Sequence, residues 1–168
     1  TLWPQTYLLP QVSLARGWER QTDEARDPEF YGRQPLTALE YRQFLDRYAV
    51  GFVAEPVGVK LDYGSTREAA LIATGLPYLA EMWSNNDWRL YAVEQPTPLA
   101  SSPAKVVSQQ DTGLTVAVPA AGRYRLRLIW SPYFVAGGAA ISRGGHNQVV
   151  LDAPGPGVYR VHAVWRWP

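Results

Sequence analysis

The sequence predicts an α+β fold in two parts: a small mixed α/β unit with an irregular amino-terminal segment over residues 1–97, and an antiparallel, β-sandwich-like unit over residues 98–168. Two observations support this division. Before the proline-containing segment at 96–98, apolar residues recur at helical spacing as well as in strands, whereas after it nearly every apolar run alternates with period two. Glycine and proline clusters also separate the later runs, which is typical of turns between strands.

The first half opens with residues 1–36, which are rich in proline and charge and are expected to be mostly irregular. Thr37 and Glu40 then match a capping box, because the hydroxyl of one can accept from a free amide while the carboxylate of the other reaches back. We therefore expect an amphipathic helix over about 38–48, followed by a short buried strand over 50–55.

A second helix is predicted to start at Ser65 and Glu68, which have the same capping-box spacing, and to end before the glycine and proline that follow it. Two strands are then expected over 78–83 and 88–93. The Asn and Asp residues between them tolerate positive φ, so these strands are predicted to form a hairpin.

The second half is predicted to consist of strands. They are expected near 104–109, 112–118, 123–130, 133–136, 148–152 and 157–165. Within the third of these, Arg123, Arg125 and Arg127 alternate with apolar residues. One wet face and one buried face are typical of an antiparallel sheet that covers a core.

Composition excludes several classes of function. The formal net charge of +1 gives no reason to expect a nucleic-acid partner. The absence of cysteine excludes disulfides and thiolate metal sites. The longest uncharged stretches, 1–15 and 128–142, are shorter than the roughly 20 residues that span a bilayer, so no membrane span is expected here. Because the chain starts at Thr1 instead of Met, we expect its natural beginning to lie upstream.

Several collinear segments resemble a family of large actinobacterial integral-membrane proteins with many spans and an extracytoplasmic carboxy-terminal region. The segments are 14–23 (LARGWERQTD), 30–31 (FY), 41–45 (YRQFL), 50–54 (VGFVA), 61–63 (LDY), 68–71 (EAAL), 75–79 (GLPYL), 88–93 (WRLYAV), 98–99 (PL) and 130–133 (WSPY). This family is similar to the C-type glycosyltransferase superfamily, which uses lipid-linked sugars on the outer face of the membrane.

The resemblance implies a non-catalytic extracytoplasmic domain of a cell-envelope membrane protein, located at the outer face of the plasma membrane. The expected partners are the membrane-embedded portion of the same polypeptide and a glycan or polyprenyl-linked sugar. No catalytic residue carries over, since the superfamily's catalytic acid lies between membrane spans, and no cofactor is expected. Two alternatives remain open: an autonomous carbohydrate-binding module, or a small glycoside-active enzyme.

One candidate binding site is a cluster of charges with helical spacing. Arg16, Glu19, Arg20 and Asp23 fall on one face of a helical turn, with Trp18 between them. Two guanidinium groups could clamp a phosphate or carboxylate. The alternative, which we favour, is a structural network of arginine and carboxylate groups that anchors the segment, with the indole buried.

Tryptophans form a second candidate site. Trp83 and Trp88 flank the predicted hairpin turn, and Trp165 and Trp167 point to one side of the last strand. If exposed, these indoles could stack on sugar rings. Large aromatic side chains in small β domains usually belong to the core, so we expect burial.

Catalytic and metal chemistry are less well supported. Glycosidases need two carboxylates about 5–10 Å apart, which draws attention to Glu55, Asp62 and Glu68, but helix starts and strand ends account for these residues. His146 and His162 have no second ligand at metal-binding spacing; the first is expected in a hairpin turn and the second on the polar face of the last strand.

Overall fold

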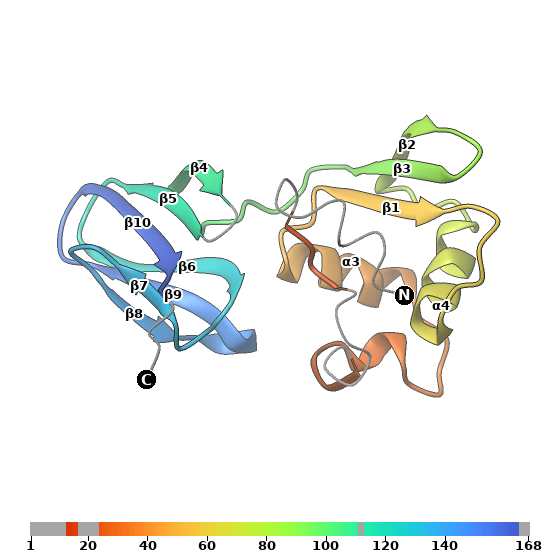
Figure 1. Cartoon of the computed structure of the whole chain (residues 1–168), viewed down its shortest axis with the longest axis horizontal. Coiled ribbons are helices and arrows are strands. Elements are labelled where there is room, and N and C mark those ends of the chain that lie inside the picture. The colour runs from red at the N-terminus through yellow and green to blue at the C-terminus, as the bar shows by residue number, and fades with distance from the viewer. Residues whose placement is uncertain (1–12, 17–23, 111–112, 165–168) are drawn as a thin grey trace. The chain divides into compact units, whose positions relative to one another are not determined.

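The computed structural model describes residues 13–16, 24–110 and 113–164, which divide into two compact units (Figure 1). The amino-terminal unit contains residues 15–97, and the carboxy-terminal unit begins at Pro98 and also includes Ser13 and Leu14. Most of the regular structure is antiparallel β-sheet, with helices in the amino-terminal unit. This confirms the predicted α+β class. None of the helices in the described ranges is both long enough and apolar enough to cross a bilayer.

Helix α3 (Ala38–Arg47) begins at the predicted capping box. The Thr37 hydroxyl accepts from the Glu40 amide at 3.2 Å, and the Thr37 amide donates to the Glu40 carboxylate at 2.9 Å. The Thr37 hydroxyl also donates to the Glu40 carboxylate at 2.7 Å, and this bond, together with the one from the Thr37 amide, lowers the pKa of Glu40 below its usual value. The helix buries Tyr41, Phe44 and Leu45 on one face and is amphipathic as predicted, although Leu39, which has the same apolar spacing, is exposed.

Helix α4 (Tyr63–Ile72) starts earlier than predicted, and the capping box expected at Ser65 and Glu68 is wrong. Asp62 is the N-cap residue, and its carboxylate accepts from the Ser65 amide at 2.7 Å. Burial raises the pKa of Asp62, but its hydrogen bonds with Ser65 outweigh this effect and the net shift is downward. Because Asp62 caps the helix one turn earlier, the Glu68 carboxylate is available for a tertiary contact.

The amino-terminal sheet contains β1 (Phe52–Pro56), β2 (Leu79–Ser84) and β3 (Trp88–Val93) in the antiparallel order β1-β3-β2. The predicted β2–β3 hairpin is confirmed, and the Asn85 side chain accepts from the Asp87 and Trp88 amides in its turn. One face of the sheet shares a hydrophobic cluster with the helices, which lie on that side in Figure 1. The sheet residues that are buried on this face are Val53, Tyr91 and Val93.

The carboxy-terminal unit contains two antiparallel sheets. The first has the order β4 (Lys105–Gln110), β5 (Gly113–Val118), β10 (Gly157–Ala163) and β7 (Phe134–Ala136). The second has the order β6 (Gly122–Ile129), β9 (Gln148–Ala153) and β8 (Ala140–Arg143). All six predicted strands are present, whereas β8, a short strand between glycine pairs, was not predicted.

Side chains from both sheets of this unit fill one hydrophobic cluster. On β6, Tyr124 and Leu126 are buried while Arg123 and Arg125 are exposed, so the predicted alternation is confirmed over this part of the strand. A register shift between Leu126 and Ile129 then interrupts the alternation.

Strands β5 and β10 approach unusually closely at Gly113, which pairs with His162. A Cβ atom at this position would lie 2.7 Å from the His162 Cα and closer still to the Val161 carbonyl oxygen. Only glycine fits here without a backbone shift, so this residue sets the spacing of the two strands.

We expect Gly113→Ala to lower the free energy of unfolding by about 1–3 kcal/mol, because the added methyl group overpacks the strand pair. The measurement is urea denaturation. Gly137→Ala is the matched control: a Cβ there meets no atom within 4 Å, so its effect should stay within about 0.5 kcal/mol. Equal effects of the two substitutions would contradict the close approach.

Candidate functional site

Arg16 lies in a partly buried polar cluster, where it forms an ion pair with Glu68 of α4. The side chains of the two residues are 12% and 18% exposed. The Tyr41 hydroxyl donates to the second Glu68 oxygen at 2.7 Å, and the Arg16 guanidinium lies 4.1 Å from the centroid of the Phe30 ring. Burial raises the pKa of Tyr41, and the charge of Glu68 raises it further. The cluster therefore joins three separate segments of the chain.

The other members of the predicted charge cluster, Trp18, Glu19, Arg20 and Asp23, lie outside the described residues. Within the described residues, Arg16 forms an ion pair with Glu68, which lies far along the sequence. The ion pair with Glu68 gives Arg16 a structural role in the described part of the chain.

A second polar cluster lies at the turn η1 (Pro28–Phe30). Asp27 is 2% exposed and accepts from the Tyr48 hydroxyl at 2.9 Å, while Arg47 lies 3.6 Å from Asp27 and 3.1 Å from Glu29. Burial and then the Asp27 charge raise the pKa of Tyr48 to about 12. These contacts attach η1 to the carboxy-terminal end of α3, and sequence analysis did not find them.

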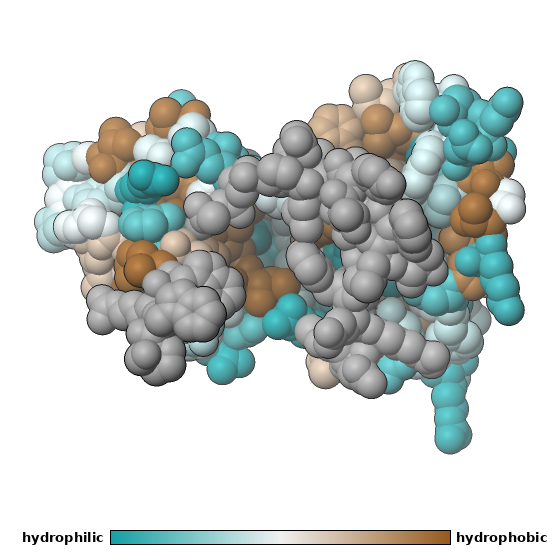
Figure 2. Space-filling view, viewed as in Figure 1, coloured by the Kyte–Doolittle hydropathy of each residue, from teal (hydrophilic) through white to brown (hydrophobic). Residues whose placement is uncertain are grey.

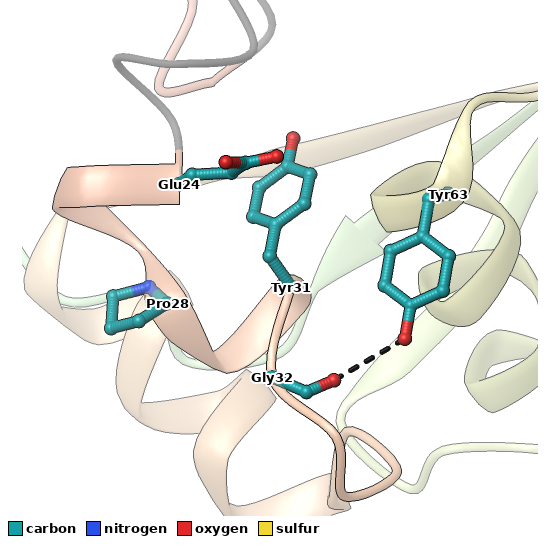
Figure 3. Close-up of a pocket in the computed structure, with 5 residues that line it drawn as sticks. All are labelled: Glu24, Pro28, Tyr31, Gly32 and Tyr63. Atoms are coloured by element: carbon teal, nitrogen blue, oxygen red, sulfur yellow. Dashed lines mark hydrogen bonds between the residues drawn. The ribbon is translucent and has the colours of Figure 1, made fainter.

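A cleft of about 480 Å³ lies between η1 and the start of α4. It is lined by Glu24, Pro28, Tyr31, Gly32 and Tyr63 (Figure 3). In Figure 3 the Tyr31 hydroxyl points toward the Glu24 end of the cleft and the Tyr63 hydroxyl toward Gly32, whose carbonyl accepts from it at 3.3 Å. The cleft therefore combines two phenol rings with carboxylate and carbonyl acceptors.

Gly64 and Arg67 hold the walls of this cleft. A Cβ atom on Gly64 would lie only 3.0 Å from two Tyr31 ring atoms, so glycine permits this close packing. The Arg67 Nη1 donates to the Tyr63 hydroxyl at 3.0 Å and to the Gly32 carbonyl, and its guanidinium carbon lies 5.3 Å from the Tyr63 ring centroid. The Nε and Nη2 atoms of Arg67 are covered and have no hydrogen-bond partner in the structure as described.

The sheet of the amino-terminal unit also has an apolar face opposite its buried face. Residues paired across antiparallel strands project to the same side, and the register therefore defines this face, called the open face below. It comprises Phe52, Ala54, Pro56, Ala80, Trp83, Trp88, Leu90 and Ala92. Phe52 is 63% exposed and Trp83 51% exposed. Apolar side chains are visible over the β2 and β3 end of this unit in Figure 2.

The expected burial of the tryptophans is wrong for Trp83, and Trp88 is half-buried. The reason is that α3 and α4 pack on the opposite face of the sheet, so neither of these described helices covers this indole. Trp165 and Trp167 lie outside the described residues.

The candidate carboxylates have separate structural contacts. Glu55 accepts from the Tyr91 hydroxyl at 3.0 Å, Asp62 caps α4, and Glu68 binds Arg16 and Tyr41. His146 lies in the β8–β9 turn at a φ of 53°, which confirms its predicted turn position. Within the described ranges, no group of three acidic or histidine side chains could hold a metal ion.

We expect Glu68→Ala to lower the free energy of unfolding by about 2–3 kcal/mol, because it leaves the partly buried Arg16 guanidinium and the Tyr41 hydroxyl without this acceptor. The measurement is again urea denaturation. Glu81→Ala, which removes an exposed carboxylate of β2, serves as the control and should change this energy by about 0.5 kcal/mol or less. If both variants are equally stable, the cluster does not stabilise the unit.

Comparisons of this chain with family models, with curated proteins and with solved structures found no match.

Proposed function

We propose that this chain is a non-catalytic domain of a multi-span membrane protein, a cell-envelope glycosyltransferase, and that it lies on the extracytoplasmic face of the plasma membrane. In this proposal it packs against the membrane-embedded portion of the same polypeptide and guides a glycan or polyprenyl-linked sugar. The open face is the observation that carries the proposal, and the family resemblance of the sequence agrees with it.

The open face supports a docking role because every residue in it is apolar. Contiguous exposed apolar surface of this kind marks interaction sites in folded proteins. The two indoles at the hairpin end of the face, Trp83 and Trp88, are also the side chains that are enriched at the boundary between membrane and water. A partner with an uncharged apolar surface fits this face.

In the same proposal the two sheets of the carboxy-terminal unit pack face to face as a β-sandwich. The support is their common hydrophobic cluster, to which Val116 and Val161 contribute from one sheet and Leu126 and Leu151 from the other. A sandwich of this kind serves more often for binding or display than for catalysis.

A non-catalytic role is supported by the contacts of the acidic side chains. A glycoside-active enzyme needs two carboxylates that face one substrate, whereas Glu55, Asp62 and Glu68 hold a tyrosine, a helix end and an arginine.

The second candidate is an autonomous carbohydrate-binding module, which the half-exposed indole of Trp83 favours. The two candidates differ in where the native protein is found and in how large it is.

The first test is cell fractionation with an antibody raised against this chain. We expect a band far above 18.8 kDa in the membrane fraction, and we expect protease added outside intact spheroplasts to remove the epitope. A cytoplasmic membrane marker protein, protected from the protease, is the control. A soluble band near 18.8 kDa would instead support the autonomous module.

The second test concerns the open face. In the purified chain, Phe52→Gln together with Trp83→Gln should change the free energy of unfolding by about 0.5 kcal/mol or less, because both side chains are exposed. In the full-length membrane protein, the same pair should make the domain more susceptible to external protease, since its docking surface is altered.

Val158→Gln is the matched control, because it removes a 65%-exposed apolar side chain from β10 in the other unit. It should leave the protease susceptibility of the membrane protein unchanged. If the double variant behaves like this control, the open face is not the docking surface.

A further inference from the structure

We infer that the cleft between Tyr31 and Tyr63 binds one pyranose ring of a neutral glycan, an inference that rests on the glycan-guiding part of the proposed function. The cleft is separate from the tryptophans of the open face, since its described lining residues lie at and around η1 and at the start of α4, and none of them belongs to the sheet. Its volume of about 480 Å³ lies within the roughly 300–1,000 Å³ that is usual for small-molecule sites.

The lining has the two kinds of surface that a sugar ring requires. Phenol rings from Tyr31 and Tyr63 offer apolar area for the C–H face of a pyranose. The Glu24 carboxylate, which has several acceptor positions, can accept from its hydroxyl groups, whereas the Gly32 carbonyl already accepts from Tyr63 and Arg67. Figure 3 shows Glu24 and Gly32 toward different ends of the cleft, with the Tyr31 ring between them and the Tyr63 ring to one side. An amphipathic ring with hydroxyl groups along its rim matches this arrangement.

The charged side chain in the lining selects against anionic ligands. Glu24 places a carboxylate in the lining, which repels phosphates and carboxylates. Arg67 places its guanidinium against the Tyr63 ring and donates to the Gly32 carbonyl, so both of these groups are already engaged by a cation. A neutral sugar does not meet this repulsion.

The walls are held in position before a ligand arrives. Tyr31 packs against the backbone of α4 at Gly64, and Tyr63 is held through its hydroxyl by Gly32 and Arg67. These side chains are already ordered, so binding costs little additional conformational entropy.

The test is an NMR titration of the ¹⁵N-labelled chain with the methyl pyranosides of glucose, galactose and mannose. We expect saturable shifts for at least one of them at residues 28–32 and 63–67, with a dissociation constant on the order of 1 mM, which is the usual strength for one small ring in an open cleft. Tyr63→Ala and Glu24→Ala should each weaken binding at least fivefold. Tyr63→Phe, which keeps the ring, should retain most of it.

Two matched controls separate this site from other aromatic surfaces. Tyr133→Ala removes a 48%-exposed tyrosine from the other unit, and Trp83→Ala removes the indole of the open face; both should bind as the unchanged chain does. Loss of binding in the Trp83 variant alone, or no saturable shift with any of the three sugars, would overturn the assignment. Neither result would bear on the proposed membrane location, which the fractionation experiment tests separately.

Discussion

The amino-terminal unit depends on one carboxylate, that of Glu68, which is shared between a guanidinium and a phenol. Through it, the segment at Arg16, helix α3 at Tyr41 and helix α4 itself are joined at a single point. A partly buried carboxylate stabilises the fold when its oxygens are hydrogen-bonded. If one of the two donors is removed, a carboxylate oxygen loses its partner in a place that water reaches poorly. The position of Tyr31 and the shape of the neighbouring cleft follow from this junction, since Arg16 and Tyr31 both pack against Gly64.

The parts of the fold that could be predicted are those with local causes. The capping box at Thr37 and Glu40 spans one helical turn, and the alternation along β6 can be read from adjacent residues. The ion pair between Arg16 and Glu68 joins residues 52 positions apart, and no local pattern distinguishes it from a capping box at Ser65. The exposure of Trp83 was likewise unpredictable, because alternation shows that a strand has two faces but not which face the helices cover.

The candidate site was missed for a related reason. Tyr31 and Tyr63 come from a turn and a helix start that are distant in sequence, and only the packing of α4 against η1 makes them walls of one cleft. The open face and the cleft therefore belong to different layers of the same unit. One is a flat apolar surface suited to a large partner, and the other is a small polar and aromatic recess suited to a single ring.

The pairing of β1 with β3 has a consequence for the order in which this unit forms. The β2–β3 hairpin is local and closes through a short turn. The partner of β1 is β3, which is synthesised only after α4 and β2. Long-range strand pairing is the slow part of folding because the intervening loop loses entropy first. During translation, β1 therefore leaves the ribosome as an unpaired strand, and the sheet is completed only when its central strand arrives last.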